Sequence, residues 1–421
     1  NIRIDQNYQF MSKVIKYKFK KNNTIGKEEI RAANKILKTG NLSGFLGSQG
    51  SGFLGGKMVK KFERQIKKFY GVKYAITVNS WTSGLIAMVG SLNVEPGDEI
   101  IVTPWTMCAT ATAILHWNCI PVFVDIDKDN FNISPEKIKK KITKKTKAII
   151  SADIFGYPAD MDGIKKVIKE KNIKIISDNA QTPFAFYKNK ISGTNCDMGG
   201  FSFNYHKHIN TGEGGVIITN SVKLAKRARL IRNHGEAVVK GKKEINNIIG
   251  HNFRMGEVEC AIGIEQYKKL KKIILKRQSL CRKLTNGLQK INGLKLPKDT
   301  KLRSHNYYMY PMVLELNKFK YNRSRIVSLL EKEGVQGLME GYSNVHLLPA
   351  FKYKIAYGKK NFPWSFNSNN FKKKYRYECK VAENLHKKSF IAIEVCLFDL
   401  NNNDVNLIIK SFEKVWKKIL K

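Results

Sequence analysis

Apolar residues in the first half of the chain follow two spacings in turn. Five short apolar runs are typical of buried strands, at 74–78, 98–103, 120–126, 146–156 and 173–180. Other segments place apolar residues three and four positions apart and predict helices, at 27–40, 55–71, 82–92, 109–117 and 162–172. Gly40 and Gly71 are expected to end the first two helices. Short strands separated by helices predict a parallel or mixed sheet with helices on both faces.

The pattern changes in the second half. A long helical segment covers 258–291, and after about Leu294 the chain shows a strand-like run at 306–316 and helical runs at 323–334 and 404–420. This change predicts a second domain of mixed α and β elements. We therefore expect an N-terminal arm at 1–24, a large domain at 25–285 and a smaller C-terminal α+β domain at 286–421.

Composition adds a strong positive charge to this picture. The chain has 421 residues with 76 basic and 34 acidic side chains, a formal net charge of +42. A polyanion partner is one interpretation and a lysine-rich composition is the other. The charge is spread along the whole chain, with no separate basic arm and no nucleic-acid motif. We therefore expect no specific nucleic-acid partner, and a field that attracts small phosphorylated substrates.

Cysteine usage and hydropathy bear on the compartment. The seven cysteines are scattered, without a CxxC pair, which fits reduced thiols in a cytoplasm better than a disulfide framework. Apolar runs stay shorter than a membrane span. We expect a cytoplasmic protein without a membrane anchor.

Three polar segments carry candidate chemistry. Ser80, Trp81 and Thr82 lie between a strand and a helix, where unsatisfied N–H groups attract anions. Asp178 ends an apolar strand, three residues before Gln181; taken alone it could be a helix N-cap.

The third segment is "FNYHKHINTGEGG" (203–215), in which Lys207 stands between two histidines and before a glycine-rich turn. Taken alone, Lys207 would be a surface charge. Together the segments offer an anion cradle, an acid and an amine, which is the set that pyridoxal phosphate requires.

Several further blocks, in order, extend the comparison to a family. They are "GGKMVKKFE", "NVEPGDEIIVTPWTMCATATAIL", "IPVFVDID", "SDNAQ", "GFSFNYHKHINTGEGG", "HNFRMGEVECAIGIEQYKKL" and "HLLPAF". Over nearly its whole length the chain resembles the DegT/DnrJ/StrS sugar aminotransferases, which have the aspartate-aminotransferase fold type I. The resemblance implies a three-layer α/β/α large domain with a mixed, mostly parallel sheet, and a smaller C-terminal α+β domain.

The resemblance also implies roles for individual residues. Lys207 would hold pyridoxal 5'-phosphate as a Schiff base, and Asp178 would pair with the pyridine nitrogen. The other cofactor-binding residues would be Ser80, Trp81, Thr82, Met107, Gln181, Ser202 and Asn252. Asn252 would reach the phosphate of the neighbouring subunit, which implies a homodimer with the active site at the subunit interface. Candidate substrate residues are His208, Arg254 and His346.

Two positions depart from the family pattern. Met107 stands where an aromatic ring usually stacks over the cofactor, although Trp105 could supply the ring if the loop shifts. Trp81 stands in the phosphate turn where glycine is commoner, so its side chain must point away from the turn.

The implied reaction moves an amino group from an amino acid, L-glutamate or glutamine, to a keto sugar, which we expect to be nucleotide-linked, in amino-sugar biosynthesis. Alternatives are a keto-cyclitol aminotransferase, a sugar dehydratase of the same family, in which histidine replaces the lysine, and a non-catalytic polyanion-binding relative. Lys207 is the fifth residue after Ser202, the lysine register of the family, which favours transamination. We expect no metal site, because His206 and His208 have no further ligands at suitable spacing.

Overall fold

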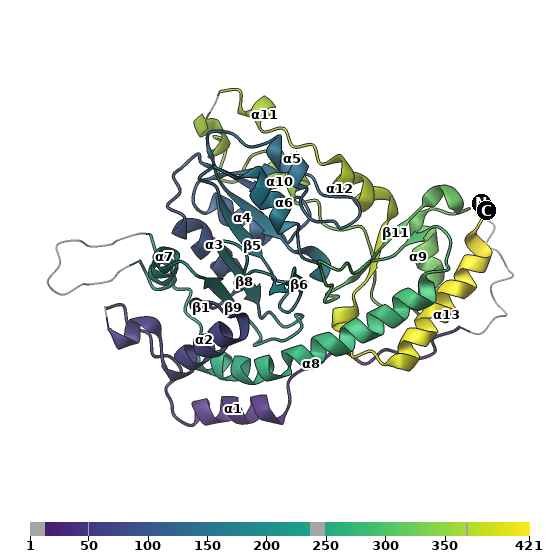
Figure 1. The fold of residues 1–421 in the computed structure, drawn as a ribbon, viewed down its shortest axis with the longest axis horizontal. Helices are drawn as coiled ribbons and strands as arrows, with labels where there is room; N and C mark the ends of the chain where they lie inside the picture. The colour runs from purple at the N-terminus through teal and green to yellow at the C-terminus, as the bar shows by residue number, and fades with distance from the viewer. Residues whose placement is uncertain (1–12, 49, 236–248, 368) are drawn as a thin grey trace.

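The computed structural model describes residues 13–48, 50–235, 249–367 and 369–421 (Figure 1). Its large sheet has seven strands in the order β1-β9-β8-β5-β4-β2-β3. Their bounds are β1 Tyr74–Val78, β2 Glu99–Val102, β3 Ile120–Phe123, β4 Thr146–Ala152, β5 Lys174–Asp178, β8 Met198–Ser202 and β9 Gly215–Thr219. β9 is antiparallel to both of its neighbours, and the other adjacent pairs are parallel. The sheet is therefore mixed and mostly parallel, as the sequence predicts.

Helices cover both faces of this sheet. α2 (Lys57–Tyr70) and α8 (Glu257–Leu288) pack on one face, and α3 (Trp81–Ser91), α4 (Cys108–Leu115), α6 (Met161–Val167) and α7 (Val222–Arg232) pack on the other. β9 shows the alternation that this requires, since Val216 and Ile218 join the α2–α8 core and Ile217 joins the α3–α7 core. The predicted three-layer α/β/α architecture is confirmed.

A second, antiparallel sheet of four strands forms the smaller α+β unit, in the order β10-β11-β13-β12. The strands are β10 Leu294–Lys295, β11 Tyr310–Leu314, β12 Leu338–Glu340 and β13 Phe390–Ile393, and the main helices are α9 Arg323–Lys332 and α13 Asn402–Ile419. α8 runs from the large sheet into this unit (Figure 1), where Leu284 and Leu288 join its core. Ile15 and Phe19 pack in the same core, so the predicted N-terminal arm, described from Lys13 on, is attached to it.

The chain returns to the large sheet between Val345 and Leu385. Phe351, Trp364 and Tyr375 from this stretch belong to the same apolar core as β2, β3 and β4. Its short helices are α10 Pro349–Lys352, α11 Phe371–Lys374 and α12 Lys380–Asn384.

The remaining elements are peripheral. α1 (Lys27–Leu37) packs along α8, and α5 (Pro135–Lys139) packs beside α6, while β6 (Phe186–Tyr187) and β7 (Lys190–Ile191) form a small hairpin. α1 ends at Leu37, three residues before Gly40, and α2 ends where predicted, directly before Gly71. Both glycines take the left-handed conformation, with φ 68° and 65°. Among the described residues, no helix combines the length and apolar character needed to cross a bilayer.

Candidate active site

The register of the large sheet brings the three polar segments to one edge. Val78, Gly215 and Ser202 are direct neighbours across β1, β9 and β8. Asp178, at the end of β5, is aligned with Gly200 of β8. The N-terminus of α3, Ser202 and Asp178 therefore lie along the same side of the sheet. This is the carboxyl end of the parallel strands, where open α/β sheets bind ligands.

Lys207 lies in the loop between β8 and β9. Its side chain is half-buried, with Nζ 3.4 Å from the hydroxyl of Tyr308 and 4.5 Å from the centroid of that ring. Burial lowers the pKa of the Lys207 amine from its ordinary value of 10.5 to about 8, although Cys396 and Asp178 act in the opposite direction. A larger fraction of this amine is neutral at physiological pH than in an exposed lysine.

Asp178 is buried, and both of its carboxylate oxygens have donors. Oδ1 accepts the indole N–H of Trp81 at 2.7 Å, and Oδ2 accepts the hydroxyl of Thr110 at 2.7 Å. The backbone N–H of Ala180 also donates to Oδ1, at 3.2 Å. Each carboxylate oxygen has two lone pairs, so the group retains acceptor capacity.

Trp81 is the first residue of α3, but its ring lies against the sheet. A Cβ at Gly200 would lie 2.5 Å from this ring, and one at Gly84 2.8 Å from it. A Cβ at Gly215 would lie 3.0 Å from the Trp81 Cα. The glycines make room for the indole, and the side chain points away from the turn, as its place in the turn requires.

The turn before α3 offers the groups of an anion site. Ser80 is the N-cap of α3, and its Oγ accepts the N–H of Ser83 at 3.1 Å. Thr82 is exposed in the first turn, where helix N–H groups lack intrahelical partners. Ser202 is buried, and its Oγ accepts the N–H of Asn204 at 3.3 Å.

The Gln181 side chain is held by the turn that follows β4. Its Oε1 accepts the backbone N–H of Phe155 at 2.5 Å, and Phe155 has φ 58°, a conformation uncommon outside glycine. The Phe155 ring packs among Phe131, Tyr342 and Phe390. That aromatic packing holds the strained residue and, through it, the Gln181 side chain.

His208, the next residue in the Lys207 loop, is fully buried. The Arg277 guanidinium contacts Nδ1, and because arginine only donates, Nδ1 is the acceptor. Nε2 therefore carries the proton and donates to the backbone oxygen of Gln181 at 3.3 Å. Burial, followed by the Arg277 charge, lowers the pKa of His208 well below its ordinary value. His208 is a neutral support between the loop and Gln181.

The other predicted residues lie around these groups. Met107, at the start of α4, is 66% exposed. Asn252 is exposed, and its Oδ1 accepts Nε of Arg254 at 2.8 Å, while its backbone oxygen lies 3.3 Å from Nδ2 of Asn79, next to Ser80. His346 is buried against Phe123, with Nε2 3.0 Å from Glu383, so it presents no exposed face to a substrate in this conformation.

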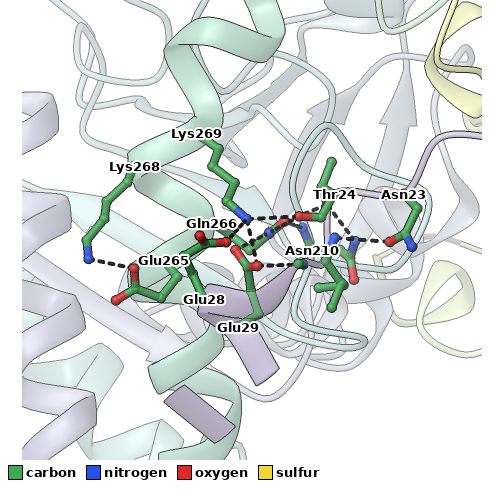
Figure 2. A network of polar contacts seen from close by, with 11 residues as sticks. Asn23, Thr24, Glu28, Glu29, Asn210, Glu265, Gln266, Lys268 and Lys269 are labelled. Atoms are coloured by element: carbon green, nitrogen blue, oxygen red, sulfur yellow. Dashed lines mark hydrogen bonds and ion pairs between the residues drawn. The ribbon is translucent and has the colours of Figure 1, made fainter. Parts of the chain in front are cut away.

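A buried polar network anchors the loop that carries Lys207 (Figure 2). Gln266 of α8 accepts the N–H of Asn210 at 3.1 Å and the hydroxyl of Thr24 at 2.7 Å. Its amide donates to the oxygen of Thr24 at 2.9 Å and to Glu29 of α1 at 2.8 Å. Lys269 donates to the other oxygen of Glu29 at 2.7 Å. The loop, α8, α1 and the N-terminal arm are thereby held together.

Three neighbours of the site were not predicted. Tyr308 precedes β11 in the run "NYYMYPM", which the pattern predicts as a strand, and that spacing does not indicate that its hydroxyl reaches Lys207. Thr110 and Arg277 lie on helices, where they resemble ordinary helix residues. Only the packing of distant segments identifies them.

A cavity of about 810 Å³ lies elsewhere, between the loop after β3 and the β10–β11 strands. Its lining includes Lys128, Lys298, Arg303 and Phe155, and none of the predicted site residues. Around the candidate site, Met107 and Tyr205 are exposed, whereas Asp178 and Ser202 are buried.

The residues present fit pyridoxal phosphate. A half-buried amine with a pKa of about 8 suits a carbonyl partner, because the neutral amine is the nucleophile. A buried carboxylate with remaining acceptor capacity suits the ring nitrogen, and the capped N-terminus of α3 suits the phosphate. Among the described residues, no group of three or more His, Cys, Asp or Glu side chains is arranged to hold a metal ion.

Comparison with known proteins identifies the family of the chain. The model of the DegT/DnrJ/EryC1/StrS aminotransferase family matches residues 24–371. The spore coat polysaccharide biosynthesis protein SpsC of Bacillus subtilis is 30% identical over 82% of this chain and 87% of its own length. The UDP-4-amino-4,6-dideoxy-N-acetyl-beta-L-altrosamine transaminase of Campylobacter jejuni is 30% identical over 80% of this chain and 88% of its own.

A solved structure extends the likeness to three dimensions. Helicobacter pylori PseC, an aminotransferase involved in the biosynthesis of pseudoaminic acid, matches with a TM-score of 0.78 and 26% identity, over 95% of this chain and 99% of that one. The family model covers most of the chain, and both the sequence relatives and this structure match across its two structural units. The chain therefore belongs to the DegT/DnrJ/EryC1/StrS aminotransferase family and is a pyridoxal-phosphate-dependent enzyme.

Proposed function

We propose that this enzyme moves an amino group from L-glutamate to the keto group of a nucleotide-linked sugar, in amino-sugar biosynthesis for a surface polysaccharide or a glycosylated metabolite. Relatives support the substrate class, since one is named for spore coat polysaccharide biosynthesis and another is a transaminase of a UDP-linked amino sugar. The net charge of +42 supports it as well, because a positive field attracts a diphosphate. A cytoplasmic location is supported by the seven free thiols.

The observation that carries the proposal is the Lys207 amine, whose pKa is lowered to about 8 beside the buried Asp178 carboxylate. When bound, pyridoxal phosphate supplies an aldehyde and an electron-withdrawing ring. Lys207 would be the covalent partner of that aldehyde. As a free amine it would remove the proton from the donor α-carbon, which requires its neutral form. A histidine at this position would instead indicate the dehydratases of the family.

The remaining residues hold and orient the cofactor in this proposal. Asp178 pairs with the ring nitrogen, and Gln181 approaches the ring hydroxyl. Met107 would pack its polarizable side chain against the ring. Ser80, Thr82, Ser202 and the backbone of Trp81 would bind the phosphate near the N-terminus of α3.

We further propose that the active site is completed by a second copy of the chain. The exposed Asn252 of each subunit contacts the phosphate in the other, and Arg254, which donates to Asn252, lies where it meets the substrate or the partner subunit. His208 and His346 are buried, so we propose that they affect substrate binding indirectly, by holding the segments that contact the substrate.

A direct test follows ¹⁵N from L-[¹⁵N]glutamate into a panel of nucleotide-linked keto sugars and keto-cyclitols. The expected result is a ¹⁵N-labelled amino sugar linked to a nucleotide. A labelled aminocyclitol would instead indicate that the substrate is a keto-cyclitol. A dehydrated sugar without ¹⁵N would indicate a dehydratase. No cofactor binding, together with DNA binding that weakens steeply with salt, would indicate a polyanion-binding relative.

Two variants test the assigned residues. Lys207→Ala is expected to bind pyridoxamine phosphate and to lose turnover by at least about a thousandfold, since a covalent partner and base is removed. Asp178→Asn is expected to slow the glutamate half-reaction more than it weakens cofactor binding, because the amide carries no charge to pair with the ring nitrogen. Full turnover in either variant would contradict its assignment. Borohydride reduction and peptide mapping should place the cofactor mass on Lys207.

A further inference from the structure

Trp81 connects two parts of the site that are separate in the sequence. It is the first residue of α3, in the turn proposed to bind phosphate. Its side chain points away from that turn and is buried, with 7% of the residue exposed. The slot for the ring is formed by Gly84 of its own helix and Gly200 of β8. A Cβ at Gly200 would lie 2.1 Å from the Val216 backbone oxygen and 2.5 Å from the ring, so a larger residue there would disturb both the strand pairing and the indole.

The indole N–H of Trp81 contacts the Asp178 carboxylate. Trp81 Nε1 donates to Oδ1 at 2.7 Å, and the Thr110 hydroxyl donates to Oδ2 at 2.7 Å. A side-chain donor on each oxygen, with the Ala180 N–H as a second donor to Oδ1 at 3.2 Å, fixes both the direction and the plane of the carboxylate. A hydrogen bond to a charged group is also among the stronger ones in proteins.

We infer that Trp81 is a positioning residue for Asp178: its indole N–H sets the direction in which the carboxylate meets the cofactor's ring nitrogen. The inference rests on the role proposed for Asp178. This role would explain why a bulky residue stands in the turn. Its backbone belongs to the phosphate turn, and its side chain contacts the carboxylate that meets the ring nitrogen. The spacing between these two contacts is then fixed by one tryptophan in a rigid slot.

The variant Trp81→Phe removes the N–H and keeps an aromatic ring. A protonated ring nitrogen withdraws electrons from the far end of the cofactor, so a poorly aligned Asp178 raises the pH at which the visible absorbance of the loaded enzyme titrates. We expect this midpoint to rise by about one pH unit, which corresponds to the loss of one charge-assisted hydrogen bond. Single-turnover bleaching by L-glutamate should slow by about tenfold for the same reason.

Two companion proteins make the measurement specific. Benzothienylalanine at position 81 replaces the N–H by sulfur in a ring of nearly the same shape, which tests the hydrogen bond if Trp81→Phe fails to fold. Trp416→Phe is the matched control, because the buried Trp416 donates its N–H to Asn292 O at 2.9 Å in the core of the smaller unit. Its absorbance midpoint should equal that of the wild-type enzyme.

The outcomes separate this inference from the proposed function. Wild-type midpoints and rates in both position-81 proteins would overturn the role of Trp81, and so would an equal shift in Trp416→Phe. If the wild-type enzyme binds the cofactor and L-glutamate does not bleach it, the proposed donor fails, while the pH titration, which needs no donor, still decides the role of Trp81.

Discussion

A lysine amine in water carries a proton at neutral pH, and Lys207 is held where that proton costs free energy. Burial lowers its pKa to about 8, and Tyr308, whose own pKa burial raises well above its ordinary value, meets it as a neutral phenol. The negative charges nearby, Cys396 when ionised and Asp178, limit the effect. The local environment therefore supplies an amine that is partly neutral under the conditions in which the enzyme works.

The lowered pKa predicts how Lys207 reacts in the protein before cofactor is added. Its modification by an amine-specific reagent, followed by peptide mass spectrometry across pH, should show a midpoint near pH 8, because the neutral amine is the reactive form. Surface lysines in the same digest serve as internal controls. A midpoint at the ordinary value of 10.5 would contradict the desolvated environment.

At the scale of elements, α8 is the support on which the site is assembled. Its N-terminal half packs on the large sheet, its C-terminal half enters the smaller unit, and Gln266 and Lys269 along its length hold α1 and the Lys207 loop. Gln266 and Glu29 are both buried, so each hydrogen bond of this network satisfies a group that water cannot reach. Anchoring by a buried network limits the positions that Asn210, and hence Lys207, can take.

Gln266→Leu should show what this network contributes. The substitution leaves the Asn210 N–H and one oxygen of Glu29 without a partner, at about 1–3 kcal/mol for each buried group. We expect a fall in thermal midpoint of several degrees and a weaker affinity for pyridoxal phosphate. Gln289→Leu is the matched control, since Gln289 caps the same helix in an exposed position. Equal effects in the two variants would remove the network from the support of the site.

At the scale of the whole molecule, the candidate site has exposed residues at its rim. Met107 and Asn252 are exposed, so a cofactor that contacts them would be left partly uncovered by this chain alone. A second copy that covers this rim would exclude water from the reacting groups, which strengthens the electrostatic contacts to the cofactor.

The proposed exchange of Asn252 between subunits can be tested by complementation. Asn252→Asp places a negative charge against the phosphate and should weaken cofactor binding, and Lys207→Ala should be inactive. If Asn252 acts across the interface, mixed dimers contain one site with both changes and one intact site. Equal mixing after subunit exchange should then restore about a quarter of wild-type sites. No recovery would place Asn252 and Lys207 in the same subunit's site.

Sequence patterns predicted most of the fold because the strands and helices of the large domain are strongly periodic. β1, β2, β4 and β5 occur where apolar runs predicted them, and α8 and α13 where helical spacing did. β8 was not predicted, because Gly199 and Gly200 are poor strand formers. Their reason is tertiary, since a Cβ at Gly199 would lie 2.4 Å from the Gly193 carbonyl oxygen and one at Gly200 would meet Trp81.

The sequence by itself determined the family, the candidate lysine and the candidate acid, because these depend on residue types at fixed spacing within single segments. The tertiary structure alone decided how those residues are surrounded. Four of these contacts join residues more than 60 positions apart: Trp81 and Thr110 with Asp178, Tyr308 with Lys207, and Arg277 with His208. Gln266 contacts Thr24 across 242 positions and Asn210 across 56. Such contacts form only when the strands assemble into the sheet and α8 packs along it, and local periodicity carries no information about them.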